Sequence, residues 1–108
     1  MGPKEFAAAC RDERDAMLTS YADASAGTAV EVHLASADLN ERQRKCVLAA
    51  IDVALTDAFY TLMLALDGSA SLGERQQSFF LTDDSGSVIA NGDGRLEAAA
   101  WDTLQSNR

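Results

Sequence analysis

This sequence has little of what catalytic and metal sites are built from. It contains one histidine, two cysteines and one tryptophan in 108 residues. Cys10 and Cys46 lie far apart, without CxxC spacing and without accompanying histidines. That pattern excludes a zinc site and a redox pair. Two free thiols are typical of a reducing compartment, so we expect a cytoplasmic protein.

The glycine-rich segments lack the residues that ligand-binding loops require. Gly68 and Gly73 have the spacing of a phosphate loop, but Glu74 stands where the lysine belongs. Residues 91–94 resemble part of a calcium loop, but Arg95 occupies the next ligand position. We therefore expect no metal, no cofactor and no catalytic residue, which favours a protein that is not an enzyme.

Positive charge is also scarce. Nine basic residues face seventeen acidic ones, which gives a formal net charge of −8. Such a surface repels phosphate backbones, so we expect no nucleic-acid partner, and it attracts a basic protein instead. At 108 residues the chain is expected to form one domain, residues 1–108, and its N-terminus shows no apolar leader segment.

The sequence is rich in alanine and has one long apolar segment. Twenty alanines and a single proline favour helix. A helix is predicted over residues 39–66, with Asp38 as N-cap, Glu41 at capping-box spacing and Gly68 just past the end. Its apolar residues fall within one arc of roughly 140°. They are Val47, Leu48, Ile51, Ala54, Leu55, Ala58, Phe59, Leu62, Ala65 and Leu66.

The opposite arc of this helix becomes apolar at Tyr60, Met63 and Leu64, which predicts that the last two turns are buried almost all round. A helix of about 28 residues spans about 42 Å, longer than a compact domain of this size. Either its charged first turns project, or it is kinked or split, or a second copy covers it in a homodimer. Asp52 and Asp57 make a membrane span costly, so we expect no membrane partner.

Shorter elements flank this segment. Residues 4–22 have helical periodicity, and residues 28–34 alternate as a half-buried strand does. Residues 76–82 and 87–90 form a predicted hairpin across a turn at 83–86, and residues 95–105 form a last helix. The predicted fold is α+β: a long central helix, flanking N- and C-terminal helices, and a small antiparallel sheet of two or three strands. Whether residues 28–34 supply the third strand stays open.

Residues 59–73, with Gln76, Gln77 and the turn at 83–86, form a recurring pattern. This run resembles small uncharacterised bacterial proteins in which an apolar helix ends in Leu-Asp-Gly and precedes a β-hairpin. The resemblance covers about a third of the chain. It implies a helix followed by a hairpin and brings no known chemistry.

Two groups of polar residues are candidate sites. Asp52, Thr56 and Tyr60 form one stripe on the central helix, and with His33 they could line a pocket. An exposed or hydrogen-bonded edge of the helix explains the same stripe. The cations at the start of this helix, which are Arg42, Arg44 and Lys45, could contact an acidic group or be solvated.

Three functions follow from these observations. The first is a small acidic protein-interaction module, such as an antagonist or immunity-type protein that binds a basic partner. The second is a small ligand-binding or enzymatic domain with a cleft between the central helix and the sheet. The third is a structural homodimer, in which the exposed part of the central helix is the interface.

Overall fold

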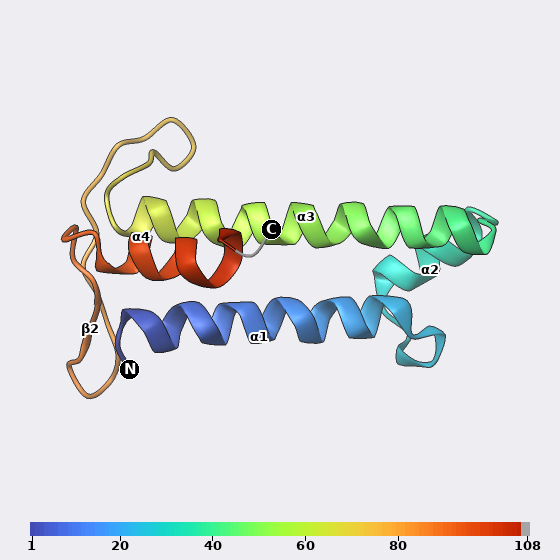
Figure 1. The fold of residues 1–108 in the computed structure, drawn as a ribbon, viewed down its shortest axis with the longest axis horizontal. Helices are drawn as coiled ribbons and strands as arrows, with labels where there is room; N and C mark the ends of the chain where they lie inside the picture. Colours follow the sequence, from blue (N-terminus) through green and yellow to red (C-terminus); the bar gives the residue numbers. More distant parts are fainter. Residues whose placement is uncertain (107–108) are drawn as a thin grey trace.

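The fold is a pair of long antiparallel helices with smaller elements at both ends. The computed structural model describes residues 1–106. Helices α1 (Pro3–Ala22) and α3 (Glu41–Leu66) lie side by side, and η1 (Ala24–Ala26) and α2 (Ala29–Ser36) connect them at one end (Figure 1). Strands β1 (Leu81–Thr82) and β2 (Val88–Ala90), α4 (Arg95–Ala100) and a π-helical turn η2 (Trp101–Gln105) occupy the other end. The predicted α+β fold with a long central helix is confirmed.

The central helix begins two residues later than predicted. Its N-cap is Asn40, whose side-chain oxygen accepts from the backbone N–H of Gln43 at 2.9 Å, while the Gln43 side chain accepts from the Asn40 N–H at 3.0 Å. The prediction of Asp38 as the cap is wrong, because Asp38 has a left-handed φ of 53° in the preceding turn. The helix then runs unbroken for 26 residues, which rules out a split.

The strand predicted over residues 28–34 is wrong, because these residues form α2. Thr28 caps this helix by accepting from the backbone N–H of Glu31 at 3.1 Å. Leu34 and Glu31 are buried, while Val32 is 57% exposed. The sheet within the described residues therefore has two strands and takes no third strand from this segment.

The predicted hairpin is present but shorter. Leu81 pairs with Ala90 and Thr82 with Val88, antiparallel and with a register shift between the two pairs. Residues 76–80, predicted as strand, precede β1 without joining it. The turn is held by Asp83, whose side chain accepts from the backbone N–H groups of Ser85 at 3.0 Å and Ser87 at 2.9 Å.

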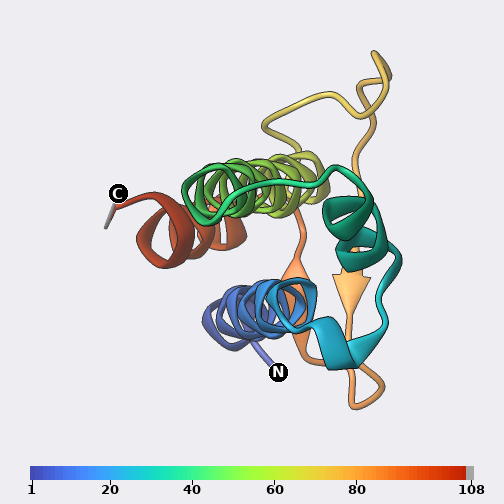
Figure 2. The same ribbon diagram turned by 90° about the vertical axis from the view of Figure 1, so that its right-hand side faces the viewer.

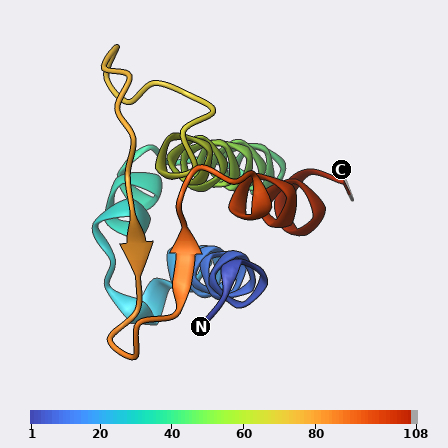
Figure 3. The same cartoon turned by 90° about the vertical axis from the view of Figure 1, so that its left-hand side faces the viewer.

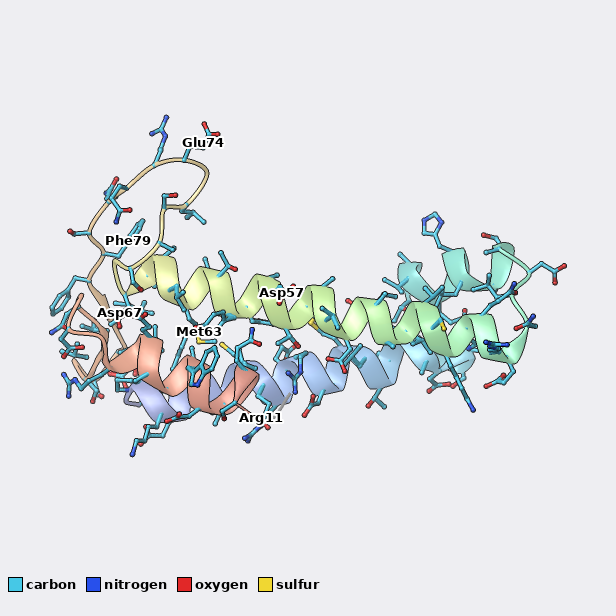
Figure 4. The ribbon with its side chains drawn as sticks, turned by 45° about the horizontal axis from the view of Figure 1, so that its top comes forward. Arg11, Asp57, Met63, Asp67, Glu74 and Phe79 are labelled. Carbon is cyan, nitrogen blue, oxygen red and sulfur yellow. The ribbon has the colours of Figure 1, made fainter. Side chains whose placement is uncertain are left out.

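The core lies at the end of the molecule where α4 packs against α1 and α3. Figure 4 shows Met63 between α3 and α4. On α4 and η2, Leu96, Ala100 and Leu104 are buried. The buried cluster consists of Ala7, Met63, Ile89, Ala90, Leu96, Ala99, Ala100 and Leu104.

Most of the apolar arc of α3 lies outside this core. The buried side chains of α3 are Thr56, Met63 and Ala65. Thr56 and Met63 lie about 120° from the centre of the predicted apolar stripe, at 100° per residue. Leu62 is 44% exposed, so the prediction that the last two turns are buried almost all round is wrong. The short α4 contacts one arc of the helix, and on the apolar arc Ala54, Ala58 and Leu62 are exposed while the larger neighbours are half-buried.

The molecule is elongated for its size. Its extents are 46 × 30 × 24 Å and its Cα radius of gyration is 16.3 Å, where a compact chain of this length has about 13 Å. Viewed along the helices, α4 lies on one side of the α1–α3 pair, and α2 and β1 lie on the other (Figures 2 and 3). The middle of that second side, between α2 and β1, is uncovered by any other element in residues 1–106.

Candidate functional site

The structure brings two of the predicted pocket residues together, as a link between the long helices. The guanidinium Nη1 of Arg14 on α1 donates to the Thr56 hydroxyl at 3.0 Å, and this hydroxyl donates to Asp52 Oδ1 at 3.3 Å. Arg14 also pairs with Asp15 at 2.9 Å. Asp52 and Thr56 thus satisfy a partly buried arginine and connect α1 to α3.

The other two residues of the predicted set lie elsewhere. Tyr60 is next to Trp101 of η2, with ring centroids 6.3 Å apart and ring planes at 59°. His33 is exposed on α2, which lies beside the beginning of α3, at the end of the molecule away from α4. The structure therefore does not gather His33 with Tyr60 in one cleft.

The cations at the start of α3 have two different surroundings. Arg44 is half-buried, and its Nη2 donates to the carbonyl oxygen of Ala22 at the end of α1 at 2.9 Å. Arg42 and Lys45 are exposed, and Arg42 borders an open cavity of about 500 Å³ beside Cys46 and Val47. An acidic contact at this end stays a prediction.

The uncovered side of the helix pair carries an apolar groove of about 200 Å³. Its α3 residues lie about 150° round the helix from Tyr60, which packs beside Trp101 of η2, so the groove faces away from the last helix. The sequence marks its α3 residues as apolar, but periodicity does not tell which side of a helix its own chain covers. We call this surface the apolar groove; its residues are Met17, Leu55, Ala58, Phe59 and Leu62.

The opposite side carries a second cavity, of about 370 Å³, between α3 and the last helix. Glu97 and Asp102 line it, and neither carboxylate forms an ion pair within residues 1–106. Of the residues that line it, the sequence singled out only Tyr60, although the spacing of residues 94, 97, 98, 101 and 102 is that of one helix face. We call it the aromatic cavity; its residues are Tyr60, Gly94, Glu97, Ala98, Trp101 and Asp102.

A buried carboxylate positions the aromatic cavity. Asp67, directly after α3, is 4% exposed. Its Oδ1 accepts from the backbone N–H of Gly92 at 3.1 Å, and its Oδ2 accepts from that of Glu97 at 3.0 Å. The sequence indicated only that a helix ends here. Asp67 in fact joins the end of α3 to the loop and first turn that place Glu97.

Metal and thiol chemistry have little support in the part of the chain that the structure describes. No group of three His, Cys, Asp or Glu side chains in residues 1–106 could hold a metal ion. Both cysteines are free thiols, and burial raises the pKa of the Cys10 thiol. Cys46 is exposed at the other end of the molecule.

Helix α3 is also long and apolar enough to cross a membrane, by length and composition. The most apolar 18-residue window has a mean hydropathy of 1.7, and 11% of that window is buried. The core helix of a soluble protein passes the same test. The criterion therefore does not distinguish between the two kinds of helix.

Comparisons with protein-family models, with curated proteins and with solved structures find no match to this chain. The resemblance drawn from residues 59–86 stays a prediction.

Proposed function

We propose that this chain is a non-enzymatic interaction module that binds a basic protein through the apolar groove. The main support is that the chain exposes more surface than a folded monomer of its mass. The chain exposes 6773 Å², where a folded monomer of this mass exposes about 5,800 Å². The difference, about 1,000 Å², is close to the roughly 800 Å² that one partner buries in a standard protein–protein interface.

The position of apolar residues supports the groove as the place of contact. Leu55, Ala58 and Leu62 lie at i, i+3 and i+7 on α3, and Met17 of α1 faces them across the groove. This spacing is the pattern by which a helix recognises an amphipathic helix laid beside it.

Charge supports a basic partner. The net charge of −8 attracts basic proteins over long range. Beside the groove, Glu13 lies one turn before Met17 on α1. This carboxylate is exposed and has no ion pair within residues 1–106. The proposed ligand is therefore a helix with an apolar face flanked by lysine or arginine.

Other ways of covering the groove have less support. Two copies of the chain would each bring a charge of −8, and that repulsion opposes a homodimer. A bilayer would have to accept Asp52 and Asp57, at about 2.5 to 3.5 kcal/mol each near the middle of a span. An antagonist or immunity-type protein fits the proposed chemistry, since neutralising a basic partner needs a binding surface and no catalytic group.

Two substitutions of equal charge test the proposal. Leu62 is 44% exposed in the groove, and Val53 is 46% exposed on another face of the same helix. The tagged wild-type chain, Leu62→Arg and Val53→Arg are used as baits in an extract of the native host at low and moderate salt. We expect one basic protein to be captured by the wild type and by Val53→Arg but not by Leu62→Arg, and less strongly at moderate salt.

The captured protein is then purified and must bind the wild-type chain directly with the same pattern. Equal binding by both arginine variants would overturn the groove as the site. A wild-type chain that sediments as a dimer, and becomes monomeric in Leu62→Arg alone, would show that a second copy covers the groove and would also overturn the proposal.

A further inference from the structure

The aromatic cavity has the composition of a site for an organic cation. Trp101 is 53% exposed, so part of its indole surface is open to a ligand, and Tyr60 packs beside it. Indole and phenol rings attract ammonium and guanidinium groups through the negative electrostatic potential of their faces. The aromatic pair alone would accept many apolar groups.

Two carboxylates give the cavity a negative charge. Glu97 is half-buried and Asp102 exposed, and both line the cavity that the two rings border. Neither is neutralised by an ion pair within the described chain. A cation over the indole would thus be held by ring faces and by carboxylates together, which is stronger than either alone.

The lysine and arginine side chains of the described chain leave the aromatic cavity open to another cation. Arg95 pairs with Asp93 at 2.6 Å, outside the cavity. Lys4 and Arg95 line a neighbouring cavity, on the other side of Ala98 and Asp102. Arg11 pairs with Asp12 on α1, at 3.2 Å. No lysine or arginine of residues 1–106 lines the aromatic cavity.

The backbone holds the cavity in place. Asp67 fixes the first turn of α4 through the Glu97 N–H. The helical bond from the Trp101 N–H to the Glu97 carbonyl keeps Trp101 on the face that carries Glu97 and Ala98. The wider turn η2 follows, closed by the bond from the Ser106 N–H to the Trp101 carbonyl at 2.9 Å. Widened turns of this kind recur at functional sites.

From these observations we propose that the aromatic cavity binds an organic cation, an ammonium or guanidinium group of about the size of a lysine or arginine side-chain end. The site lies across α3 from the apolar groove, and this proposal does not depend on the one made for that groove. The cation belongs either to a side chain of a partner protein or to a free amine.

Tryptophan fluorescence reports on the aromatic cavity, because Trp101 is the one tryptophan of the chain. The full chain is titrated with N-acetyl-lysine amide, N-acetyl-arginine amide, tetramethylammonium and spermidine, while its tryptophan emission is recorded. N-acetyl-norleucine amide and glucose are the uncharged comparisons. We expect a saturable change with the cations and binding about tenfold weaker for the uncharged compounds.

The carboxylates are tested with two double variants of equal net charge. Glu97→Gln with Asp102→Asn should weaken cation binding about tenfold, because it removes the charge and keeps the shape. Glu74→Gln with Asp84→Asn removes two exposed charges from loops outside the cavity, and should change the affinity by less than about twofold. Thermal unfolding of each variant verifies that it folds.

The amide signals of Gly94 and Ala98 in NMR spectra give a second readout that does not depend on emission. Tighter binding of the amino-acid amides than of tetramethylammonium and spermidine points to a partner's side chain, and the reverse order points to a free amine. Equal binding of norleucine amide or glucose, unchanged signals at Gly94 and Ala98, or equal weakening in both double variants would overturn the proposal.

Discussion

Asp67 shows how one side chain can join two parts of the fold. It follows α3, and its two carboxylate oxygens accept from backbone N–H groups of Gly92 and Glu97. Hydrogen bonds to an ionised acceptor stabilise more than neutral ones, and a buried donor that loses its acceptor is costly. This carboxylate therefore ties the end of the central helix to the start of the last one.

We expect Asp67→Ala to lower the free energy of unfolding by about 3 kcal/mol, because two N–H groups lose a charged acceptor. Asp57→Ala is the matched control, since Asp57 is exposed on α3 and should change stability by less than about 0.5 kcal/mol. Urea denaturation measures both. Equal stability of the two variants would show that Asp67 does not hold α4.

The sequence identified several of these residues as candidates but did not reveal the contacts that they make. Thr56 and Asp52 were recognisable as a polar stripe, but a single sequence does not reveal that Arg14, on another helix, meets them. Asp67 was visible as part of a helix end, and its carboxylate contacts depend on residues 25 and 30 positions later. Long-range partners of this kind are set by the packing of elements and not by local pattern.

Among the elements, those with strong local signals were predicted well. Periodicity located α1, α3 and the last helix, and the turn at residues 83–86 located the hairpin. Residues 28–34 were misassigned because Val30 and Leu34 share one face in a helix and also one face in a strand. The Thr28 cap, which accepts from Glu31 three residues on, decides for the helix.

The contacts of Asp83 in the hairpin turn predict how the stability of the fold depends on pH. The ammonium group of Met1 and then the Ser85 hydroxyl and the Ser87 N–H hold the pKa of Asp83 well below its ordinary 3.8. A carboxyl whose pKa is lower in the folded state stabilises the fold while it is ionised. Its contribution is complete above about pH 4 and is lost as pH falls below 3.8 toward the folded value.

We therefore compare the wild type with Asp83→Asn by urea denaturation from pH 6 to pH 2. The wild type should be the more stable at pH 6 and pH 5, and the difference should shrink as pH falls below 4. A difference that stays constant over this range would contradict the role given to the carboxylate, since an asparagine does not titrate.

For the whole molecule, the sequence predicted the long helix but not its surroundings. An apolar stripe indicates that a face is covered, and it does not say whether the cover comes from the same chain. Here α4 and α1 cover the arc of Thr56 and Met63, while Leu55 and Leu62 border the apolar groove. The proposed function requires that this side is exposed in the free chain.

Small-angle X-ray scattering with a mass measurement on the same eluting sample tests that claim most directly. We predict a monomer of 11.5 kDa whose radius of gyration is near the Cα value of 16.3 Å. A value near 13 Å, as for a compact chain of this length, would mean that α3 bends and buries its own apolar face. A mass of two chains would mean that a second copy covers it, and either result would contradict the account.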